Sequence, residues 1–500
     1  MRDYVNTAVM ESDGIYKEVV VIGNGPSGLA LSYMLAGNWP YYNGNTHLDE
    51  MLTARLKNSP SGRSLVQQDL KFLSEGLEGR SNHPISLLMD SLNHPSADQG
   101  LDLPSLLNWR SNPERLVDHV VLGKGPPGGA WHTMDGNVLT ISLNTWMELP
   151  GLEFRKWESH HNCNSSGAPR RVPVATVAAY YKDYVKQMGL SRFMRFGVVV
   201  TSVSLLDCRQ NQANTCIEDQ TELGSCHCQP LWSVEGFDTT TGLPFTYICK
   251  KVILASGSTD LHNRLNVSGE MRHPNWIFHN LKTLEDELNI LVEKNKDSRD
   301  GVCQVDPVLI VGAGLSAADG IISARFHSVP VIHVFRRPAG SSEKTLPENM
   351  YPEYHKVHQM MGDKGLGYSD YRAFPEHKIC EFSAKPDKKV KIMSSSGVQT
   401  CHQVSLVAVL IGSRPDLSFM SPEFEDGKKL GVYPERHIDC RSNPMAIDPY
   451  TYCLTQGPPG LYALGPLAGD NFVRFLIGGA LAITAHIYWE KKAQRTPAHR

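Results

Sequence analysis

The chain has 500 residues, which is enough for roughly two to four domains with large hydrophobic cores. Its 49 basic and 52 acidic residues leave a net charge of −3, so no general attraction to nucleic acid or to anionic membranes is expected. Hydrophobic residues make up 41% and charged residues 20%, which is the composition of a globular protein and excludes a disordered chain.

The 11 cysteines are odd in number and scattered, as expected for reduced thiols in an intracellular protein. Metal binding comes into question only at Cys226-His227-Cys228, with Cys216 upstream. A structural zinc site needs ligand pairs that close a tetrahedron, so we favour a polar loop and predict no metal site. The expected location is the cytoplasm, with the nucleus or an organelle as alternatives.

Neither end of the chain predicts a targeting or anchoring segment. Residues 1–14 lack the basic start, the apolar stretch and the cleavage site of a signal peptide. The run from Phe472 to Trp489 approaches the length of a membrane span, but it contains Arg474, His486 and the pair Gly478-Gly479. A buried helix is therefore favoured over an integral membrane segment.

The first predicted elements are a strand at Val19-Val20-Val21-Ile22, buried on both faces, and a helix from Leu29 to Leu35. Between them Gly23-Asn24-Gly25-Pro26-Ser27-Gly28 fits the pattern G-x-G-x-x-G. The first glycine allows the tight turn, the second lets the backbone approach a pyrophosphate, and the third lets helix and strand pack closely. This context predicts a dinucleotide site, with a glycine turn that binds nothing as the alternative.

A second strand-turn-helix unit follows the strand from Val308 to Val311. Its turn is Gly312-Ala313-Gly314-Leu315-Ser316-Ala317, a helix is predicted from Ser316 to Phe326, and the next strand, Val331 to Phe335, ends in Arg336-Arg337. An NAD site usually has an acid there for the ribose 2′-hydroxyl, whereas arginines bind a 2′-phosphate. The unit therefore predicts NADPH, and a solvated arginine pair is the alternative.

Two dinucleotide motifs require two dinucleotides, and FAD beside NADPH is the economical pairing. Three later strings are typical of two-dinucleotide flavoproteins: Val252 to Gly257, Leu406 to Gly412 with Ser413-Arg414-Pro415-Asp416, and Gly460 to Gly465 with Gly469-Asp470. In such enzymes the carboxylate of the late Gly-Asp pair accepts from the flavin's ribityl hydroxyls. Asp470 is therefore a candidate FAD ligand.

The stretch from Val120 to His132 resembles the second strand of an FAD domain followed by the Gly-Gly-x-Trp turn of class B flavin monooxygenases. Trp131 and His132 are candidate neighbours of the isoalloxazine, with plain core roles as the alternative. The strand ends at Gly123-Lys124 in place of the usual Glu or Asp, so no residue is assigned to the FAD ribose.

From about Val19 to Trp489 the chain resembles the oxidative stress-induced growth inhibitor family, most closely its second member around residues 123–157. The strings that carry the resemblance are Leu73 to Ser81, Trp146 to Pro150, Tyr351 to Met361 and Gly465 to Phe475. The resemblance implies an FAD- and NADPH-dependent, monooxygenase-like oxidoreductase that uses O₂ and an unidentified small molecule or protein side chain. It also implies roles in growth regulation, oxidative stress and germ-cell maturation in meiosis, with protein partners.

Two departures from related enzymes limit what the resemblance implies. The pattern Phe-x-Gly-x-x-x-His of flavin-containing monooxygenases is not recognised, and its region holds only Trp276-Ile277-Phe278-His279. The segment from Leu139 to Asn144 is similar to a piece of the N-hydroxylating monooxygenases, but Asn144 stands near where those enzymes have a lysine. The catalytic candidates are therefore Trp131, His132 and Asn144, without a defined amine chemistry.

The predicted fold is α/β, with two Rossmann-like dinucleotide-binding domains and a discontinuous FAD domain. The expected division is a tail (1–17), the first part of the FAD domain (18–265) with an insertion (38–116), the NADPH domain (301–405), the C-terminal part of the FAD domain (406–490) and a tail (491–500). The polar tracts Asp207 to Gln229 and Leu284 to Asp300 are expected to be a hairpin connection and an interdomain linker. The alternative function is a regulatory protein that binds FAD and NADPH, turns over little and acts through a partner.

Overall fold

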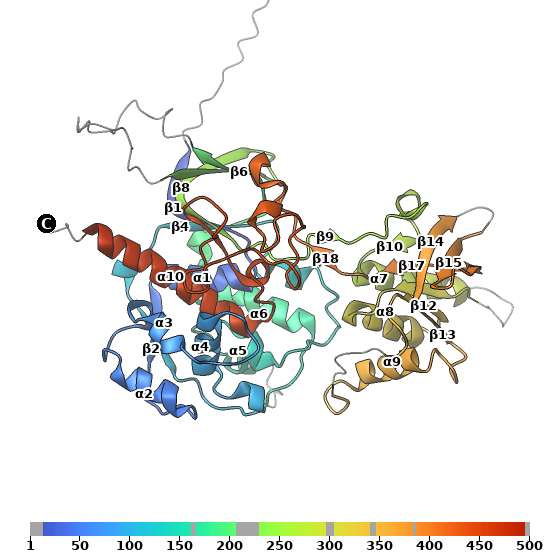
Figure 1. Cartoon of the computed structure of the whole chain (residues 1–500), viewed down its shortest axis with the longest axis horizontal. Helices are drawn as coiled ribbons and strands as arrows, with labels where there is room; N and C mark the ends of the chain where they lie inside the picture. The colour runs from blue at the N-terminus through green and yellow to red at the C-terminus, as the bar shows by residue number, and fades with distance from the viewer. Residues whose placement is uncertain are drawn as a thin grey trace, which may run out of the picture. The chain divides into compact units, whose positions relative to one another are not determined.

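The computed structural model describes residues 14–161, 167–206, 230–296, 305–340, 347–383 and 387–495. The chain divides into two compact units (Figure 1). The first comprises Met1–His132, Leu139–Ser258 and Pro415–Arg500, and the second comprises Thr133–Val138 and Thr259–Arg414. Each unit contains one of the two glycine motifs.

The first unit is built on a seven-stranded sheet with the order β5-β4-β1-β8-β7-β6, in which β19 also pairs with β8. Its strands are β1 (Ile15–Ile22), β4 (His119–Gly123), β5 (Met194–Phe196), β6 (Val198–Leu206), β7 (Leu231–Asp238), β8 (Pro244–Leu254) and β19 (Leu461–Ala463). β1 is parallel to β4 and β8, and β19 is parallel to β8. The carboxyl ends of these strands therefore meet at one edge of the sheet, where α/β proteins bind nucleotides.

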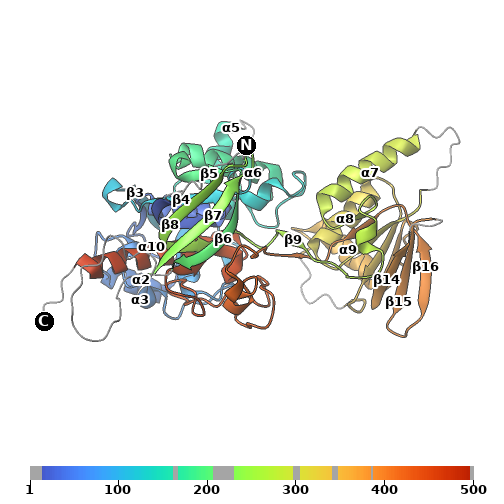
Figure 2. The same ribbon diagram turned by 90° about the horizontal axis from the view of Figure 1, so that it is seen from above.

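The strands β6, β7 and β8 form an antiparallel meander in the same sheet (Figure 2). The hairpin of β6 and β7 agrees with the hairpin predicted around residues 207–229. The connecting tract itself, with Cys216, Cys226 and Cys228, lies outside the described residues. Among the described residues, no group of three His, Cys, Asp or Glu side chains could hold a metal ion.

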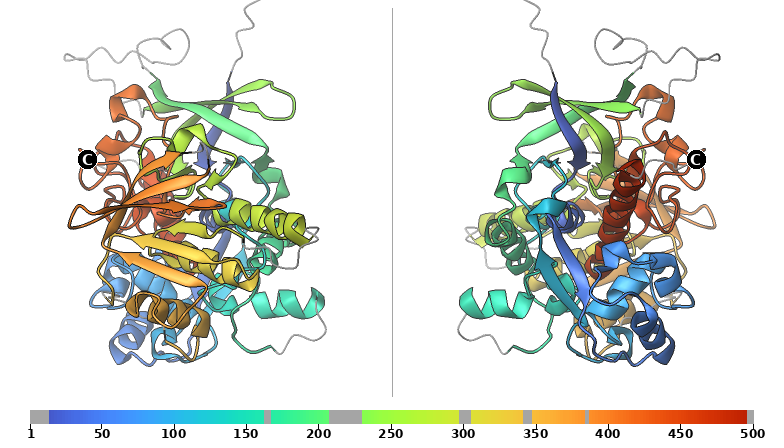
Figure 3. Two further views of the ribbon diagram at one scale, coloured as in Figure 1. Left: turned by 90° about the vertical axis from the view of Figure 1, so that its right-hand side faces the viewer. Right: turned by 90° about the vertical axis from the view of Figure 1, so that its left-hand side faces the viewer.

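Helices α1 (Pro26–Leu35) and α10 (Val473–Arg495) are the central helices of the first unit. α10 packs against both α1 and α4 (Pro84–Asn93), as the right-hand view of Figure 3 shows for α10, in dark red, beside the blue segment that contains α4. Nearly every residue of α10 as far as Ile487 is buried, so the predicted buried helix is confirmed. None of the described helices is long and apolar enough to cross a membrane.

The insertion 38–116 folds into the first unit as a two-stranded ribbon and a set of helices. Its elements, and those that follow it, are β2 (Asn38–Tyr42), α2 (Glu50–Asn58), α3 (Leu70–Ser74), β3 (Leu107–Ser111), α5 (Phe154–His161) and α6 (Val174–Gln187). The insertion supplies partners for the charged residue of α10, because Arg474 lies 3.5 Å from Asp90 and hydrogen-bonds Asp98. Arg474 is therefore neutralised within the protein.

The second unit contains a five-stranded parallel sheet with the order β10-β17-β11-β12-β13 and a three-stranded antiparallel sheet, β14-β15-β16, seen in orange in the left-hand view of Figure 3. Its strands are β9 (Leu261–His262), β10 (Ile277–Phe278), β11 (Val308–Val311), β12 (Val331–Phe335), β13 (Tyr371–Pro375), β14 (His377–Ser383), β15 (Lys389–Ser394), β16 (Gln399–Gln403), β17 (Val407–Val409) and β18 (Ser413–Arg414). Its helices are α7 (Leu281–Lys296), α8 (Leu315–Phe326) and α9 (Pro352–Gly362).

Helix α7 corrects the predicted interdomain linker. Residues 284–296 are helical, and only the remainder of the tract from Leu284 to Asp300 lies outside the described residues. Leu284 and Leu288 are fully buried and stand four residues apart, so they lie on one helical face, which packs against α8. The charged residues that surround them had suggested a linker.

The unit boundaries also differ from the sequence-based ones. The main segment of the second unit is Thr259–Arg414, whereas the NADPH domain was expected at 301–405 and the first part of the FAD domain was expected to end at 265. The reason at the later boundary is that β17 pairs with β10 and β11, and β18 pairs with β9. The string from Leu406 to Gly412 therefore completes the sheet of the second unit.

Candidate functional site

The first glycine turn connects β1 to α1 and has two positions that accept only glycine. Gly23 has φ +118°, and a Cβ there would lie 2.1 Å from the carbonyl oxygen of Ala255. A Cβ on Gly28 would lie 2.0 Å from the carbonyl oxygen of Gly23. The turn, the end of β8 and the helix are therefore in direct backbone contact, as the motif predicted.

The middle glycine of this turn faces open space. No heavy atom lies within 4 Å of the position that a Cβ on Gly25 would occupy. Gly25 is also the N-cap of α1, no side chain caps the helix, and Pro26 follows it. The free N–H groups and the positive dipole end of the helix make this space suited to a phosphate. Ser27 is buried next to Gly465, where a Cβ would lie 2.1 Å from the serine Oγ.

The second glycine turn, between β11 and α8, repeats this arrangement. Gly312 has φ +134°, and a Cβ there would lie 2.2 Å from the carbonyl oxygen of Leu410. Gly314 is the uncapped N-cap of α8, and no atom lies within 4 Å of its Cβ position. Ser316, in the first turn of α8, is exposed. The structure thus provides a second helix N-terminus with an open backbone.

A buried histidine holds the second turn. His333, in the middle of β12, lies with Nε2 2.6 Å from the carbonyl oxygen of Gly312 and with Nδ1 2.8 Å from the hydroxyl of Tyr371. Burial lowers the pKa of His333 to about 4, so the ring is neutral at pH 7. The neutral ring donates from Nε2 to the turn and accepts from Tyr371 at Nδ1.

The strand that follows each turn ends differently. β12 is followed by Arg336 and Arg337, both exposed, as a pair that reads a 2′-phosphate requires. β4 ends at Gly123, whose Cβ position is 2.2 Å from the side chain of Asn24, and Asn24 donates to the carbonyl oxygen of Gly125. The side-chain amide of Asn24 therefore occupies the space beside Gly123, at the end of β4 where an acid that binds the ribose would be expected.

A cavity of about 400 Å³ lies at the carboxyl ends of β4 and β5. Three lysines line it, Lys124 from the loop after β4 and Lys182 and Lys186 from α6, together with apolar residues such as Phe196. None of its lining residues is acidic. Sequence analysis missed this cavity, because its lysines come from two segments, the loop after β4 and helix α6, that only the fold brings together.

The residues predicted near a flavin ring lie close to the first turn. Gly129 would place a Cβ 3.2 Å from the Cα of Gly25, and Trp131 follows it and packs edge-on against Tyr181 at 5.9 Å. His132 is half-buried, with Nε2 2.7 Å from the carbonyl oxygen of Pro127. The ring of His132 is thus bound to its own loop.

Asn144 is fully buried in a short 3₁₀ helix, Asn144–Met147. The hydroxyl of Tyr181 donates to the carbonyl oxygen of Met147. Because the ring of Tyr181 also packs against Trp131, this tyrosine connects the 3₁₀ helix with Trp131. The Asn144 Oδ1 accepts from the backbone N–H groups of Thr145 and Arg170, but its Nδ2 is buried without a partner. A buried amide donor without a partner is rare and indicates a position that a bound group could complete.

Asp470 is buried and accepts hydrogen bonds from three hydroxyl groups. Ser81 bonds Oδ1 at 3.0 Å, and Ser86 and Tyr452 bond Oδ2 at 3.0 and 2.7 Å. Burial raises the pKa of Asp470, while nearby His83 and the hydroxyl donors lower it. Two of these donors belong to the insertion, which the sequence did not connect with Asp470. Oδ1 accepts one bond and retains acceptor capacity for a ligand.

The loop before Trp276 has the Gly and the His of the pattern Phe-x-Gly-x-x-x-His but lacks its Phe. The spacing is present a few residues earlier as Val267-x-Gly269-x-x-x-His273, with Val in place of Phe. Gly269 has φ +86°, and a Cβ there would lie 2.0 Å from the carbonyl oxygen of Phe382. The His273 ring stacks on Trp276 at 5.4 Å. The glycine and the histidine are thus part of an ordered loop of the second unit.

Curated proteins match the chain over nearly its whole length. Human oxidative stress-induced growth inhibitor 2 is 42% identical over 499 residues, covering 96% of this chain and 94% of that protein. Human oxidative stress-induced growth inhibitor 1 is 40% identical over 489 residues, covering 96% of each. A homolog from Caenorhabditis elegans is 28% identical over 484 residues, covering 94% of each. No protein-family model matches the chain.

Solved structures share the fold at low sequence identity. The bacillithiol disulfide reductase from Bacillus cereus has a TM-score of 0.56 at 14% identity, covering 95% of this chain and 99% of that chain. The ornithine N-hydroxylase of Kutzneria sp. 744, named with FADred, NADP⁺ and L-orn, has a TM-score of 0.53 at 11% identity, covering 96% and 100%. The FAD-bound cadaverine monooxygenase of Erwinia amylovora has a TM-score of 0.51 at 12% identity, covering 96% and 95%. The chain therefore has the fold of two-dinucleotide flavoproteins.

Proposed function

Because the chain belongs to the oxidative stress-induced growth inhibitor family and has the fold of two-dinucleotide flavoproteins, we propose that it is an FAD- and NADPH-dependent monooxygenase-like oxidoreductase. Its substrates in this proposal are NADPH, O₂ and a small molecule or protein side chain. The proposed biological role is growth restraint under oxidative stress, and it rests on the names of the relatives. A part in germ-cell maturation is a finer proposal that rests on the family resemblance.

One observation carries the proposal. Each unit presents a strand-turn-helix in which the outer glycine is locked by backbone contact while the middle glycine, Gly25 or Gly314, faces open space at an uncapped helix N-terminus. A side chain would fill the space that a pyrophosphate needs, so glycine at these two positions is explained by a ligand. Packing within the protein does not require it.

FAD would be held in the first unit by the turn around Gly25 and the N-terminus of α1. Ser256 follows β8 beside this turn, and its buried Oγ has no partner, so it is a further group that a ligand could complete. Asp470 would add its carboxylate through the remaining capacity of Oδ1. The lysine-lined cavity beyond Gly125 would receive the adenosine end.

NADPH would be held in the second unit by the turn around Gly314, with Ser316 at the first turn of α8. Arg336 and Arg337 would bind the 2′-phosphate by charge-assisted hydrogen bonds, and because both side chains are exposed, the pair together would contribute roughly 1.5–3 kcal/mol. His333 would fix the carbonyl of Gly312 and thereby the shape of the turn.

Bound FAD would supply the electron transfer and the oxygen chemistry, which side chains cannot perform. The chain's own contribution is to position the substrates and to exclude water. Trp131 and Asn144 are the residues proposed to border the reacting region, and the Asn144 amide is an available hydrogen-bond donor there. His132 is proposed to shape the loop, since its Nε2 binds the Pro127 carbonyl.

A regulatory protein that binds both nucleotides but turns over little is the second candidate. The observations that favour it are the departures from enzyme patterns: Gly123-Lys124 at the end of β4 and Val267 in place of Phe. Such a protein would act through a partner that responds to nucleotide occupancy.

The test is to purify the full chain, measure its flavin absorbance, and add NADPH first without and then with O₂. The proposed enzyme binds FAD, NADPH bleaches the flavin under anaerobic conditions, and O₂ restores the absorbance with consumption of NADPH. A protein that binds FAD which NADPH never reduces would support the regulatory candidate. A protein that binds no FAD would contradict both.

A further inference from the structure

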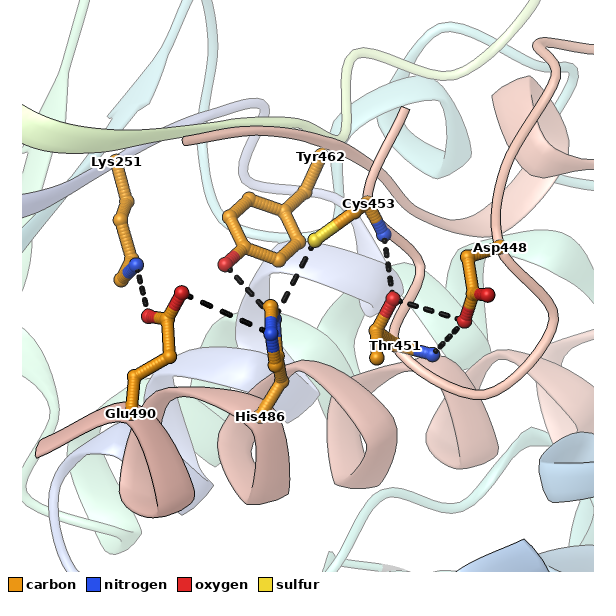
Figure 4. Close-up of polar contacts among 7 residues, drawn as sticks. All are labelled: Lys251, Asp448, Thr451, Cys453, Tyr462, His486 and Glu490. Carbon is orange, nitrogen blue, oxygen red and sulfur yellow. Dashed lines mark hydrogen bonds and ion pairs between the residues drawn. The ribbon is translucent and has the colours of Figure 1, made fainter. Parts of the chain in front are cut away.

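A cluster of titratable side chains lies in the first unit away from the glycine turn. It is centred on His486 of α10 and contains Cys453, Tyr462 of β19, Glu490 and Lys251 of β8 (Figure 4). Cys453 is half-buried and has no disulfide partner. Nothing in the proposed oxidoreductase activity uses these residues.

The contacts of the cluster arrange a thiol, an imidazole and a carboxylate in a row. The Cys453 Sγ lies 3.3 Å from the Nδ1 of His486, and the Tyr462 hydroxyl lies 3.0 Å from the same nitrogen. On the other side of the ring, Nε2 lies 3.7 Å from an oxygen of Glu490 (Figure 4). Lys251 forms an ion pair with that carboxylate and fixes its position.

The proton of the resting thiol can be placed from these contacts. Burial raises the pKa of the Cys453 thiol and lowers the pKa of His486, so both groups are neutral at pH 7. The Nε2–H of the neutral ring then faces Glu490, and Nδ1 is an acceptor for the thiol or the tyrosine hydroxyl. The thiol as nucleophile, the imidazole as base and the carboxylate that orients the base thus lie next to one another in that order.

We propose that Cys453 is an oxidisable thiol that hydrogen peroxide converts to a sulfenic acid, with His486 as the base. His486 Nδ1 takes the thiol proton, and Glu490 stabilises the imidazolium. The thiolate attacks one peroxide oxygen, an S–O bond forms as the O–O bond breaks, and the departing hydroxide takes the proton from His486 to become water. Sulfur loses two electrons and the peroxide gains them, so that one thiol and one peroxide yield one sulfenic acid and one water.

The arrangement separates Cys453 from the other described cysteines, which are Cys249, Cys380, Cys401 and Cys440. Among these described thiols, Cys453 alone has an imidazole within hydrogen-bonding distance. Cys249 is fully buried, whereas Cys401 is exposed. Exposure alone would favour Cys401, so the two residues distinguish a base-assisted reaction from simple access.

The experiment treats the full chain with hydrogen peroxide and a dimedone probe, without added NADPH, and measures labelling of each cysteine by peptide mass spectrometry. Because no nucleotide is added, the result is independent of the proposed oxidoreductase function. Among the five described cysteines we expect Cys453 to be labelled fastest, in the wild type and in the Cys401→Ser control alike. His486→Gln is expected to lower the rate at Cys453 on the order of 100-fold, the usual contribution of a general base.

Two further labelling measurements serve as controls. Tyr462→Phe removes the competing donor at Nδ1, so labelling of Cys453 is expected to stay at or above the wild-type rate. Labelling of the buried Cys249 marks any variant that has unfolded. Equal labelling rates at Cys453 and Cys401, an unchanged rate in folded His486→Gln, or a loss of labelling in folded Tyr462→Phe would each overturn the proposal.

Discussion

The two glycine turns of this chain have nearly the same backbone and different surroundings. In both, the first glycine has positive φ, +118° at Gly23 and +134° at Gly312, and the middle glycine is an extended N-cap, with ψ −179° and −178°. The groups that flank the turns are not shared, since Asn24 covers the end of β4 while an arginine pair follows β12. The backbone of the glycine turn is thus repeated, whereas the side chains beside the two turns differ.

The third position of the motif shows the same contrast. At Gly28 a Cβ would lie 2.0 Å from a backbone oxygen, whereas Ala317 already carries a Cβ at the corresponding place of the second turn. The first turn is packed more tightly against its helix. The two turns therefore differ both in residues of the motif, such as Asn24, and in residues that follow the next parallel strand, and packing decides which glycines can change.

The largest expected effect is that of Gly28→Ala. Its Cβ would lie 2.0 Å from the carbonyl oxygen of Gly23, a backbone atom that cannot rotate away, so the cost should exceed the roughly 3 kcal/mol at the upper end of ordinary overpacking. Ala317→Gly, the matched change in the second turn, should cost only about 1 kcal/mol through helix propensity. Urea unfolding of both variants measures the difference. Equal destabilisation would show that the two turns are packed alike.

Acid should weaken the second turn through His333, although the buried His119 of β4 in the first unit also has a pKa lowered to about 4 by burial. Since the folded pKa is about 4 and the ordinary value is 6.5, the unfolded chain binds a proton between these values that the folded chain does not. This contribution to stability is therefore present above pH 6.5 and is lost as the pH falls towards 4, by on the order of 3 kcal/mol at about 1.4 kcal/mol per pKa unit.

His333→Gln keeps a donor and removes this titration. Thermal unfolding of the variant between pH 7 and 4.5 should therefore show a flatter dependence on pH than the wild type. The first turn has Asn24 at its flank, which does not titrate, so Asn24→Ser is expected to leave the pH dependence unchanged. Parallel pH profiles for the wild type and His333→Gln would contradict this account.

The smallest expected effect concerns cofactor choice. Replacing both Arg336 and Arg337 by Gln should weaken NADPH binding by about tenfold to a hundredfold, from roughly 1.5–3 kcal/mol of charge-assisted hydrogen bonding. NADH has no 2′-phosphate, so its affinity should not change. Lys182→Gln with Lys186→Gln is the matched control in the first unit and should leave NADPH binding unaltered. Titration of the protein with both nucleotides measures the affinities, and equal losses would remove the arginines from this role.

The elements that sequence predicted well are those with a local signature. The strands before Gly23 and Gly312 are short buried apolar runs, and the glycines that follow them sit where a turn must make backbone contact. Both strand-turn-helix segments are therefore confirmed, except that β1 begins earlier, at Ile15, and that α1 and α8 begin at Pro26 and Leu315, at the turns themselves.

The features that sequence missed depend on spacing or on distant contacts. Helix α7 has only two fully buried leucines among many charged residues. Its apolar periodicity is therefore weak, and the composition of the segment is that of a linker. Asp470 accepts hydrogen bonds from Ser81 and Ser86, which precede it by 389 and 384 residues. Cys453 contacts His486 because α10 passes beside the segment that includes β19. Such contacts follow from the packing of the insertion and of α10, which no local pattern encodes.

A crossed pair of variants shows whether each glycine turn binds one dinucleotide. No heavy atom lies within 4 Å of the Cβ position at Gly25 or at Gly314, so we expect both valine variants to fold. We predict that Gly25→Val is purified without FAD and still binds NADPH, and that Gly314→Val keeps FAD but no longer binds NADPH, as measured by flavin absorbance and by NADPH titration. Full retention of both nucleotides by either folded variant, or loss of the same nucleotide from both, would show that the two turns do not bind separate dinucleotides.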